Sequence, residues 1–185
     1  MSTTTASDTI VQEIAIKGSA ERIFDALTDP DQRVRWWGSE GRFQAKRMES
    51  DLRPGGRWMM EGIGMGGRPF KVVGTYRNVE RPRLLVSTWL PDWQGDATES
   101  LVRFDLEEAN GVTTVRLTHS GLVSETSRES HKGWPQILAW LRAYVEGERG
   151  GVRVELEGGD VGGDFSNRVG RKHGVRSPAG RERAR

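Results

Sequence analysis

Apolar and polar side chains alternate in a series of short segments between residues 43 and 119, and this alternation constrains the fold more than any other feature. A period of two predicts β-strands that bury one face. The expected strands are 10–17, 43–48, 56–62, 70–79, 84–89, 101–106 and 113–119. Turn residues separate them, among them Asn110-Gly111, a pair that favours a two-residue hairpin turn. The pattern therefore predicts an antiparallel sheet with one face in water.

The two faces of this sheet differ sharply in polarity. The predicted apolar face carries Trp58, Met60, Phe70, Val72, Tyr76, Leu85, Trp89, Val102, Phe104, Leu106, Val115, Leu117 and His119. The opposite face carries Arg57, Lys71, Arg77, Arg103, Asp105 and Arg116.

Three helices complete the expected order. Ser19 and then Asp29-Pro30 provide helix start signals after the first strand, which predicts two short helices there. A longer helix is expected over 127–146, opened by a capping box from Thr126 to Glu129. Its apolar stripe consists of Trp134, Ile137, Leu138, Leu141 and Val145. Because Gly133 and Pro135 interrupt the helical pattern, a kink or a late start near Trp134 is expected.

The composition changes along the chain and predicts one domain with two appendages. All seven tryptophans lie between Trp36 and Trp140, whereas glycine and arginine accumulate after Gly147. We therefore expect a flexible arm over 1–9, a folded domain over 10–147 and a mostly disordered tail over 148–185. The absence of cysteine excludes disulfides and thiolate ligands. With neither a signal sequence nor a membrane span apparent, a cytoplasmic protein is expected.

Several stretches resemble one known family. DPDQRVRWWGSEG, DLRPGGRWMMEG, VVGTYRNVERPRLLVSTW, LTHSGL and HKGWPQILAWLRAYVE are similar to successive segments of the activator of heat-shock-protein-90 ATPase family, within the START-like SRPBCC superfamily. The resemblance spans about residues 10–147. It implies an α+β helix-grip fold, in which a curved antiparallel sheet wraps a long C-terminal helix. It also implies a cavity between sheet and helix that holds a small apolar molecule or a lipid.

The candidate lining of that cavity is dominated by aromatic residues. The expected lining residues are Trp36, Trp37, Trp58, Met60, Phe70, Val72, Tyr76, Trp89, Phe104, His119, Trp134, Ile137, Leu138 and Leu141. Two interpretations of the tryptophans stay open, because they can either line a cavity or simply fill the core.

Catalytic and cofactor signals are weak. The spacing of Gly62-x-Gly64-x-x-Gly67 matches the dinucleotide-binding motif, but that motif must be followed by a helix and here a strand follows. We therefore expect a hairpin loop, which could also form a lip of the cavity. His119 is expected to be buried with a structural partner, His131 to face solvent, and Glu61 to lie on the charged face. If a bulge turned Glu61 inward, it would form with His119 the one plausible acid–base pair. Neither a metal nor a cofactor is expected.

Three functions remain at this stage. The first is binding of an apolar molecule or lipid, the second is an enzyme that acts on an apolar substrate in the same cavity, and the third is a chaperone-regulating or other protein-interaction module. The segment 165–185 carries a charge of +6, from seven basic residues and Glu182. We expect from it only weak, salt-sensitive binding to nucleic acid, without sequence specificity.

Overall fold

The computed structural model describes residues 8–39, 41–95 and 98–147. The tail expected over 148–185, and all but the last two residues of the expected arm, lie outside the described residues.

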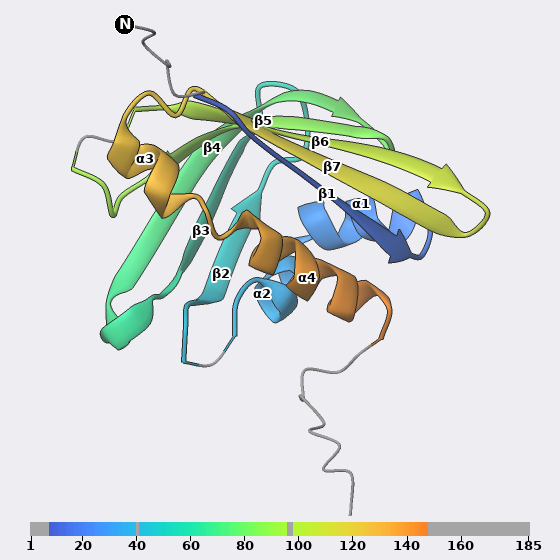
Figure 1. Ribbon diagram of the computed structural model, residues 1–185, viewed down its shortest axis with the longest axis horizontal. Coiled ribbons are helices and arrows are strands. Elements are labelled where there is room, and N and C mark those ends of the chain that lie inside the picture. Colours follow the sequence, from blue (N-terminus) through green and yellow to red (C-terminus); the bar gives the residue numbers. More distant parts are fainter. Residues whose placement is uncertain (1–7, 40, 96–97, 148–185) are drawn as a thin grey trace, which may run out of the picture. The chain divides into compact units, whose positions relative to one another are not determined.

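Seven strands form one antiparallel sheet in the order β1-β7-β6-β5-β4-β3-β2 (Figure 1). The strands are β1 (Ile10–Lys17), β2 (Gln44–Ser50), β3 (Arg57–Ile63), β4 (Pro69–Glu80), β5 (Leu84–Pro91), β6 (Ser100–Ala109) and β7 (Val112–Ser120). Each lies where the alternation predicts it, with ends shifted by a few residues. The turn between β6 and β7 uses Asn110 and Gly111 at φ of 53° and 75°, as a tight hairpin requires. The predicted α+β helix-grip fold is confirmed.

The two early helices begin as their caps predict. The helices are α1 (Ala20–Thr28) and α2 (Pro30–Trp36). Ser19 accepts the backbone N–H of Arg22, and Asp29 accepts that of Asp31. These side chains supply acceptors for N–H groups that have no partner within their helix.

The single helix expected over 127–146 is divided into two helices, and the first of them begins earlier than predicted. The chain forms α3 (Glu125–Ser130) and then α4 (Trp134–Val145). The predicted capping box is wrong, since Ser124 is the cap of α3 and accepts the N–H of Ser127. Pro135 has no N–H to donate back to residue 131, which explains why helical bonding does not continue through this point. The predicted late start at Trp134 is confirmed.

The core lies between one face of the sheet and helices α1, α2 and α4 (Figure 1). Every residue predicted on the apolar sheet face is buried except Phe70, which is half-buried. The stripe of α4 is buried as well, apart from the half-buried Ile137. Between β3 and β4 the chain makes a short 3-10 turn, η1 (Met65–Gly67), which projects from the end of the hairpin. The one-sided sheet and the one-sided helix thus bury each other's apolar surface.

Gly74 of β4 provides a test of this packing. It lies opposite Trp58 of β3, and a Cβ atom at Gly74 would lie 2.5 Å from Trp58 Nε1 and 2.0 Å from the carbonyl oxygen of Thr88. Both distances are shorter than any tolerable contact, so the strands or the indole would have to move. Gly74→Ala should therefore lower the free energy of unfolding by about 1–3 kcal/mol, the usual cost of overpacking, in chemical denaturation.

Gly133→Ala is the matched control, because a Cβ there meets no atom within 4 Å and the residue has an α-helical backbone. Its effect should stay within about 0.5 kcal/mol. Equal effects of the two substitutions would contradict the described packing of Trp58 on Gly74.

Candidate functional site

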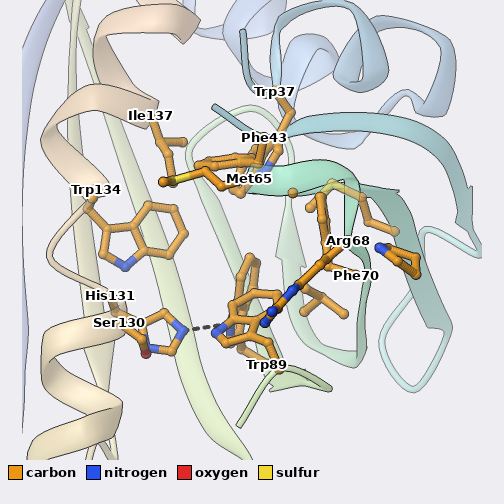
Figure 2. A pocket seen from close by; sticks show the side chains of 16 residues that line it. Trp37, Phe43, Met65, Arg68, Phe70, Trp89, Ser130, His131, Trp134 and Ile137 are labelled. Atoms are coloured by element: carbon orange, nitrogen blue, oxygen red, sulfur yellow. Dashed lines mark hydrogen bonds between the residues drawn. The ribbon is translucent and has the colours of Figure 1, made fainter. Parts of the chain in front are cut away.

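A pocket of about 350 Å³ opens where the chain breaks between α3 and α4 and faces the sheet (Figure 2). Its lining comes from the helix break, from β3 to β5, from the loops that follow β3 and β5, and from the chain between α2 and β2. The lining residues are Trp37, Phe43, Met60, Gly64, Met65, Arg68, Pro69, Phe70, Val72, Trp89, Trp93, Ser130, His131, Gly133, Trp134 and Ile137. Most of these side chains are aromatic or aliphatic, so the pocket is built to hold apolar matter.

Two crossed hydrogen bonds join the helix break to the sheet behind the pocket. Trp134 Nε1 of α4 donates to His119 Nδ1 of β7 at 3.0 Å. In the opposite direction, Trp89 Nε1 of β5 donates to His131 Nε2, at the end of α3, also at 3.0 Å (Figure 2). The two imidazole rings meet edge to face with their centroids 4.6 Å apart. Each indole N–H can only donate, so each imidazole must accept through that nitrogen.

This arrangement determines the protonation of both histidines. The other nitrogen of His119 lies 2.8 Å from Ser100 Oγ, which itself donates to the Trp89 carbonyl oxygen, so His119 donates from Nε2. His131 donates from Nδ1 to the Ser127 carbonyl oxygen at 2.7 Å. Both rings are therefore neutral and fully hydrogen-bonded.

Burial reinforces the neutral state. Removal from water, with a smaller effect from the neighbouring His131, lowers the pKa of His119 from 6.5 to about 3. Burial also lowers the pKa of His131, although its bond to the Ser127 carbonyl opposes this shift. His119 is buried with structural partners as its sequence position predicts. The prediction that His131 faces solvent is wrong, because the chain turns inward between α3 and α4 and leaves this side chain 6% exposed.

Four tryptophans form a continuous aromatic cluster next to these histidines. Trp89 lies at its centre, with ring centroids 5.5 Å from Trp58, 5.5 Å from Trp134 and 5.9 Å from Trp37. Trp37 also meets Trp134 edge to face at 5.9 Å. Tilted and edge-on ring contacts of this kind are the favourable geometries for aromatic pairs. Three of its members, Trp37, Trp89 and Trp134, form the inner wall of the pocket, and Trp58 lies behind them.

A buried arginine supports that wall and was not singled out in the sequence. The Arg33 guanidinium lies over the Trp37 ring at 4.4 Å from its centroid, with Trp58 at 5.7 Å. It donates to the Leu27 carbonyl oxygen at 2.7 Å, while its Nε and the indole nitrogen of Trp58 have no hydrogen-bond partner. Burial lowers the pKa of Arg33 to about 10, and Tyr76 partly opposes the shift. An arginine that stacks on indole rings in this way holds Trp37 by cation–π attraction.

The structure divides the predicted lining residues into two groups. Trp37, Met60, Phe70, Val72, Trp89, Trp134 and Ile137 border the pocket. Trp36, Trp58, Tyr76, Phe104, His119, Leu138 and Leu141 lie in the closed core outside its lining. The tryptophans are thus divided between the border of the pocket and the closed core. Whether any of these residues contacts a ligand stays a prediction.

The remaining lining residues were missed as pocket residues, and they come mainly from loops. Gly64, Met65 and Arg68 belong to the glycine-rich loop between β3 and β4, which the sequence allowed as a lip of the cavity, and Pro69 begins β4. Trp93 comes from a loop. Phe43, Ser130, His131 and Gly133 fall within the expected strand 43–48 and helix 127–146, but they lie at the start of that strand and at the helix break, where the period does not give the direction of a side chain. The tryptophan at position 93, within a loop that also contains Pro91 and Gly95, was the one available signal in the sequence.

The candidate acid–base pair does not assemble. Glu61 points to the charged face of the sheet, where its carboxylate lies 3.0 Å from Lys71 Nζ and 3.6 Å from an Arg47 guanidinium nitrogen. His119 lies on the buried face. No group of three or more His, Cys, Asp or Glu residues suited to a metal ion occurs in the described ranges. Across the same ranges, no helix is long and apolar enough to cross a membrane.

Comparisons with known proteins agree with the fold. A family model described as activator of Hsp90 ATPase homolog 1-like protein matches residues 17–146. A crystal structure from Chromobacterium violaceum is 25% identical, with a TM-score of 0.67 over 75% of this chain and 97% of that one. The solution structure of an AHSA1-like protein from Aeromonas hydrophila is 28% identical, with a TM-score of 0.63 over 76% and 93%. An AHSA1 protein from Silicibacter pomeroyi is 26% identical, with a TM-score of 0.62 over 76% and 99%. No curated protein matches significantly.

The lowered pKa of His119 predicts an acid-sensitive fold. A histidine with a depressed pKa in the folded state binds its proton first in the unfolded chain, so stability is complete above pH 6.5 and falls as the pH drops toward about 3. His119 alone should lower the free energy of unfolding by about 2 kcal/mol between pH 7 and pH 5. His119→Asn should reduce this pH dependence in urea titrations at several pH values.

Thr113→Val is the control, because it removes a buried hydrogen bond to the Gly18 carbonyl oxygen without removing a titratable group. It should lower stability by the same amount at every pH. An unchanged pH slope in His119→Asn would show that His119 protonates as readily in the folded protein as in the unfolded one.

Proposed function

The chain belongs to the family of activator of Hsp90 ATPase homolog 1-like proteins, and from this membership and its pocket we propose that it binds a small apolar molecule or a lipid between the sheet and the C-terminal helix. The family falls within the SRPBCC superfamily of ligand-binding helix-grip proteins. The proposal concerns the pocket at the break between α3 and α4.

The observation that carries this proposal is the apolar lining of an open pocket in an otherwise close-packed core. Well-packed interiors leave few voids larger than a water molecule, so a pocket of about 350 Å³ bordered by aromatic rings is unusual for a purely structural core. Its size lies at the lower end of the roughly 300–1,000 Å³ typical of small-molecule sites. A compact ligand fits it better than a long lipid chain.

Binding without chemistry is favoured over catalysis by the state of the titratable groups. Glu61 and His119, the pair with the best claim to acid–base roles, lie on opposite faces of the sheet, and neither borders the pocket. His131 does border it, but both of its nitrogens are engaged in hydrogen bonds. A base needs a free lone pair within reach of its substrate. Among the residues that the structure describes, the pocket therefore offers no histidine or carboxylate with a free lone pair for acid–base catalysis.

The chaperone-related name of the family suggests a third function, a protein-interaction module. The apolar side chains most exposed near the pocket, Met65 at 73% and Trp93 at 45%, are themselves part of its lining. Ligand binding therefore accounts for their exposure, and no separate surface for a protein partner is needed to explain it. A stoichiometric chaperone recovered with the full chain would reverse this ranking.

A pair of neighbouring substitutions on α4 tests the pocket. Ile137 points into it (Figure 2), whereas Gln136 is exposed and outside the lining. In titrations with the uncharged fluorescent probe N-phenyl-1-naphthylamine, Ile137→Trp should fill the pocket and weaken binding about tenfold or more, a loss of about 1.4 kcal/mol. Gln136→Trp adds the same side chain outside the pocket and should leave affinity within about twofold of the parent.

Thermal melting of both variants verifies that they remain folded. Unchanged probe affinity in a folded Ile137→Trp variant would place binding elsewhere and contradict the proposal. Native mass spectrometry of the gently purified full chain should then identify the class of any retained molecule. A mass excess that disappears in Ile137→Trp, and persists in Gln136→Trp, is the expected result.

A further inference from the structure

The mostly apolar pocket carries a charge at one point of its rim. Arg68 is the sole charged residue in the lining, judged over the part of the chain that the structure describes. Within that part its guanidinium has no carboxylate partner, and no aspartate or glutamate borders the pocket. Among the exposed arginines of the sheet, Arg47 and Arg103 are paired with carboxylates, whereas Arg57 and Arg116 have no ion pair within the described residues but lie away from this pocket. A cation at the mouth of an apolar pocket is thus left without an internal counter-charge.

Backbone hydrogen bonds in the β3–β4 loop fix the position of the Arg68 main chain. Gly64 N donates to the Arg68 carbonyl oxygen at 2.6 Å, and Gly67 N donates to the Gly64 carbonyl oxygen at 3.2 Å, which closes the loop on itself. Gly66 and Gly67 have φ of 70° and 75°, a conformation that glycine adopts without strain. From this closed loop the exposed Arg68 side chain extends along the mouth of the pocket, across from Trp134 and His131 (Figure 2).

We propose that the pocket selects small amphipathic anions, with the apolar body of the ligand among the aromatic rings and its single acidic group at the mouth against Arg68. This inference rests on the proposed function and deepens it by assigning the charge of the ligand. The fork of donors on a guanidinium matches a carboxylate or a similar oxyanion.

The position of the charge agrees with the cost of desolvation. Arg68 is exposed, so an acidic group beside it keeps part of its hydration, whereas burial of the same group among Trp37, Trp89 and Trp134 would be strongly unfavourable. The neutral state of His131 leaves Arg68 as the one charged group in the described lining, since the Arg33 guanidinium lies behind the Trp37 ring. One anionic group at one end of the ligand is therefore the arrangement that fits.

The aromatic rings alone could equally attract a cation, because ring faces bind ammonium groups. Arg68 opposes that alternative, since its own charge would repel a ligand cation that entered the same mouth. Loss of the Arg68 charge therefore changes the affinity for an anion and for a cation in opposite directions. Removal of its charge weakens the binding of an anion and strengthens that of a cation.

Three probes that share a naphthyl body and carry an anionic, a neutral or a cationic head group provide the test. Isothermal titration calorimetry of the full chain would use 2-naphthylacetate, 2-(2-naphthyl)ethanol and 2-(2-naphthyl)ethylammonium, each at low and at high sodium chloride. The variants are Arg68→Gln, Arg68→Lys and the control Arg57→Gln, which removes an equal charge from an exposed position outside this pocket.

The expected result is specific to the anion. Arg68→Gln should weaken 2-naphthylacetate binding about three- to tenfold, the range for a partly exposed charged hydrogen bond, and change the neutral alcohol less than about twofold. Arg68→Lys should recover part of the loss, and Arg57→Gln should change neither ligand more than about twofold. The anion's advantage in the parent protein should shrink at high salt, because salt screens exposed charges.

Two outcomes would overturn the inference in distinguishable ways. If the parent binds the alcohol, but Arg68→Gln affects both ligands equally or the ammonium binds most tightly, anion selection is wrong while the proposed function stands. If none of the three probes binds, and N-phenyl-1-naphthylamine does not bind either, the pocket is not a ligand site and both proposals fail.

Discussion

The crossed pair of indole–imidazole hydrogen bonds is the interaction on which the rest of the site depends. One bond runs from the helix to the sheet, from Trp134 to His119, and the other runs from the sheet to the helix break, from Trp89 to His131. Each requires a neutral imidazole, so the pair works only in a dry environment that keeps the histidine pKa values low. The same burial that hides the two rings makes them structural groups and removes them from acid–base chemistry.

This connection explains how a pocket can persist beside a well-packed core. The chain between α3 and α4 is not helical, and without a fixed attachment it could collapse onto the sheet and fill the space. His131 holds the end of α3 to β5, and Trp134 holds the start of α4 to β7. The short segment between the two helices is therefore attached to the sheet at both of its ends. On the opposite wall, Arg33 stacks on Trp37 and holds it in place. The pocket is thus bordered by side chains whose rotamers are already constrained.

Sequence patterns predicted the secondary structure well where a local signal and the tertiary fold agree. The strands followed from the two-residue alternation, and Ser19 and Asp29 marked the starts of two helices because a short polar side chain satisfies free backbone N–H groups in any context. The capping box at Thr126 failed because Ser124, two residues earlier, supplies the competing cap. Local chemistry allowed both starts, and the structure begins the helix at the earlier one. His131 was misplaced for a related reason, since periodicity gives no direction to a residue in a helix break.

By itself the sequence determined the antiparallel one-faced sheet, the apolar stripe of the last helix and the identity of the family, because these depend on periodicity and on contiguous segments. It could not separate the tryptophans that fill the core from those that border a pocket, since Trp58 and Trp89 have the same pattern in the chain and differ only in what covers them. Nor could it bring Arg68 to the mouth of that pocket. The tertiary structure decided both, because a cavity is the space left between elements distant in sequence, and no local pattern encodes that space.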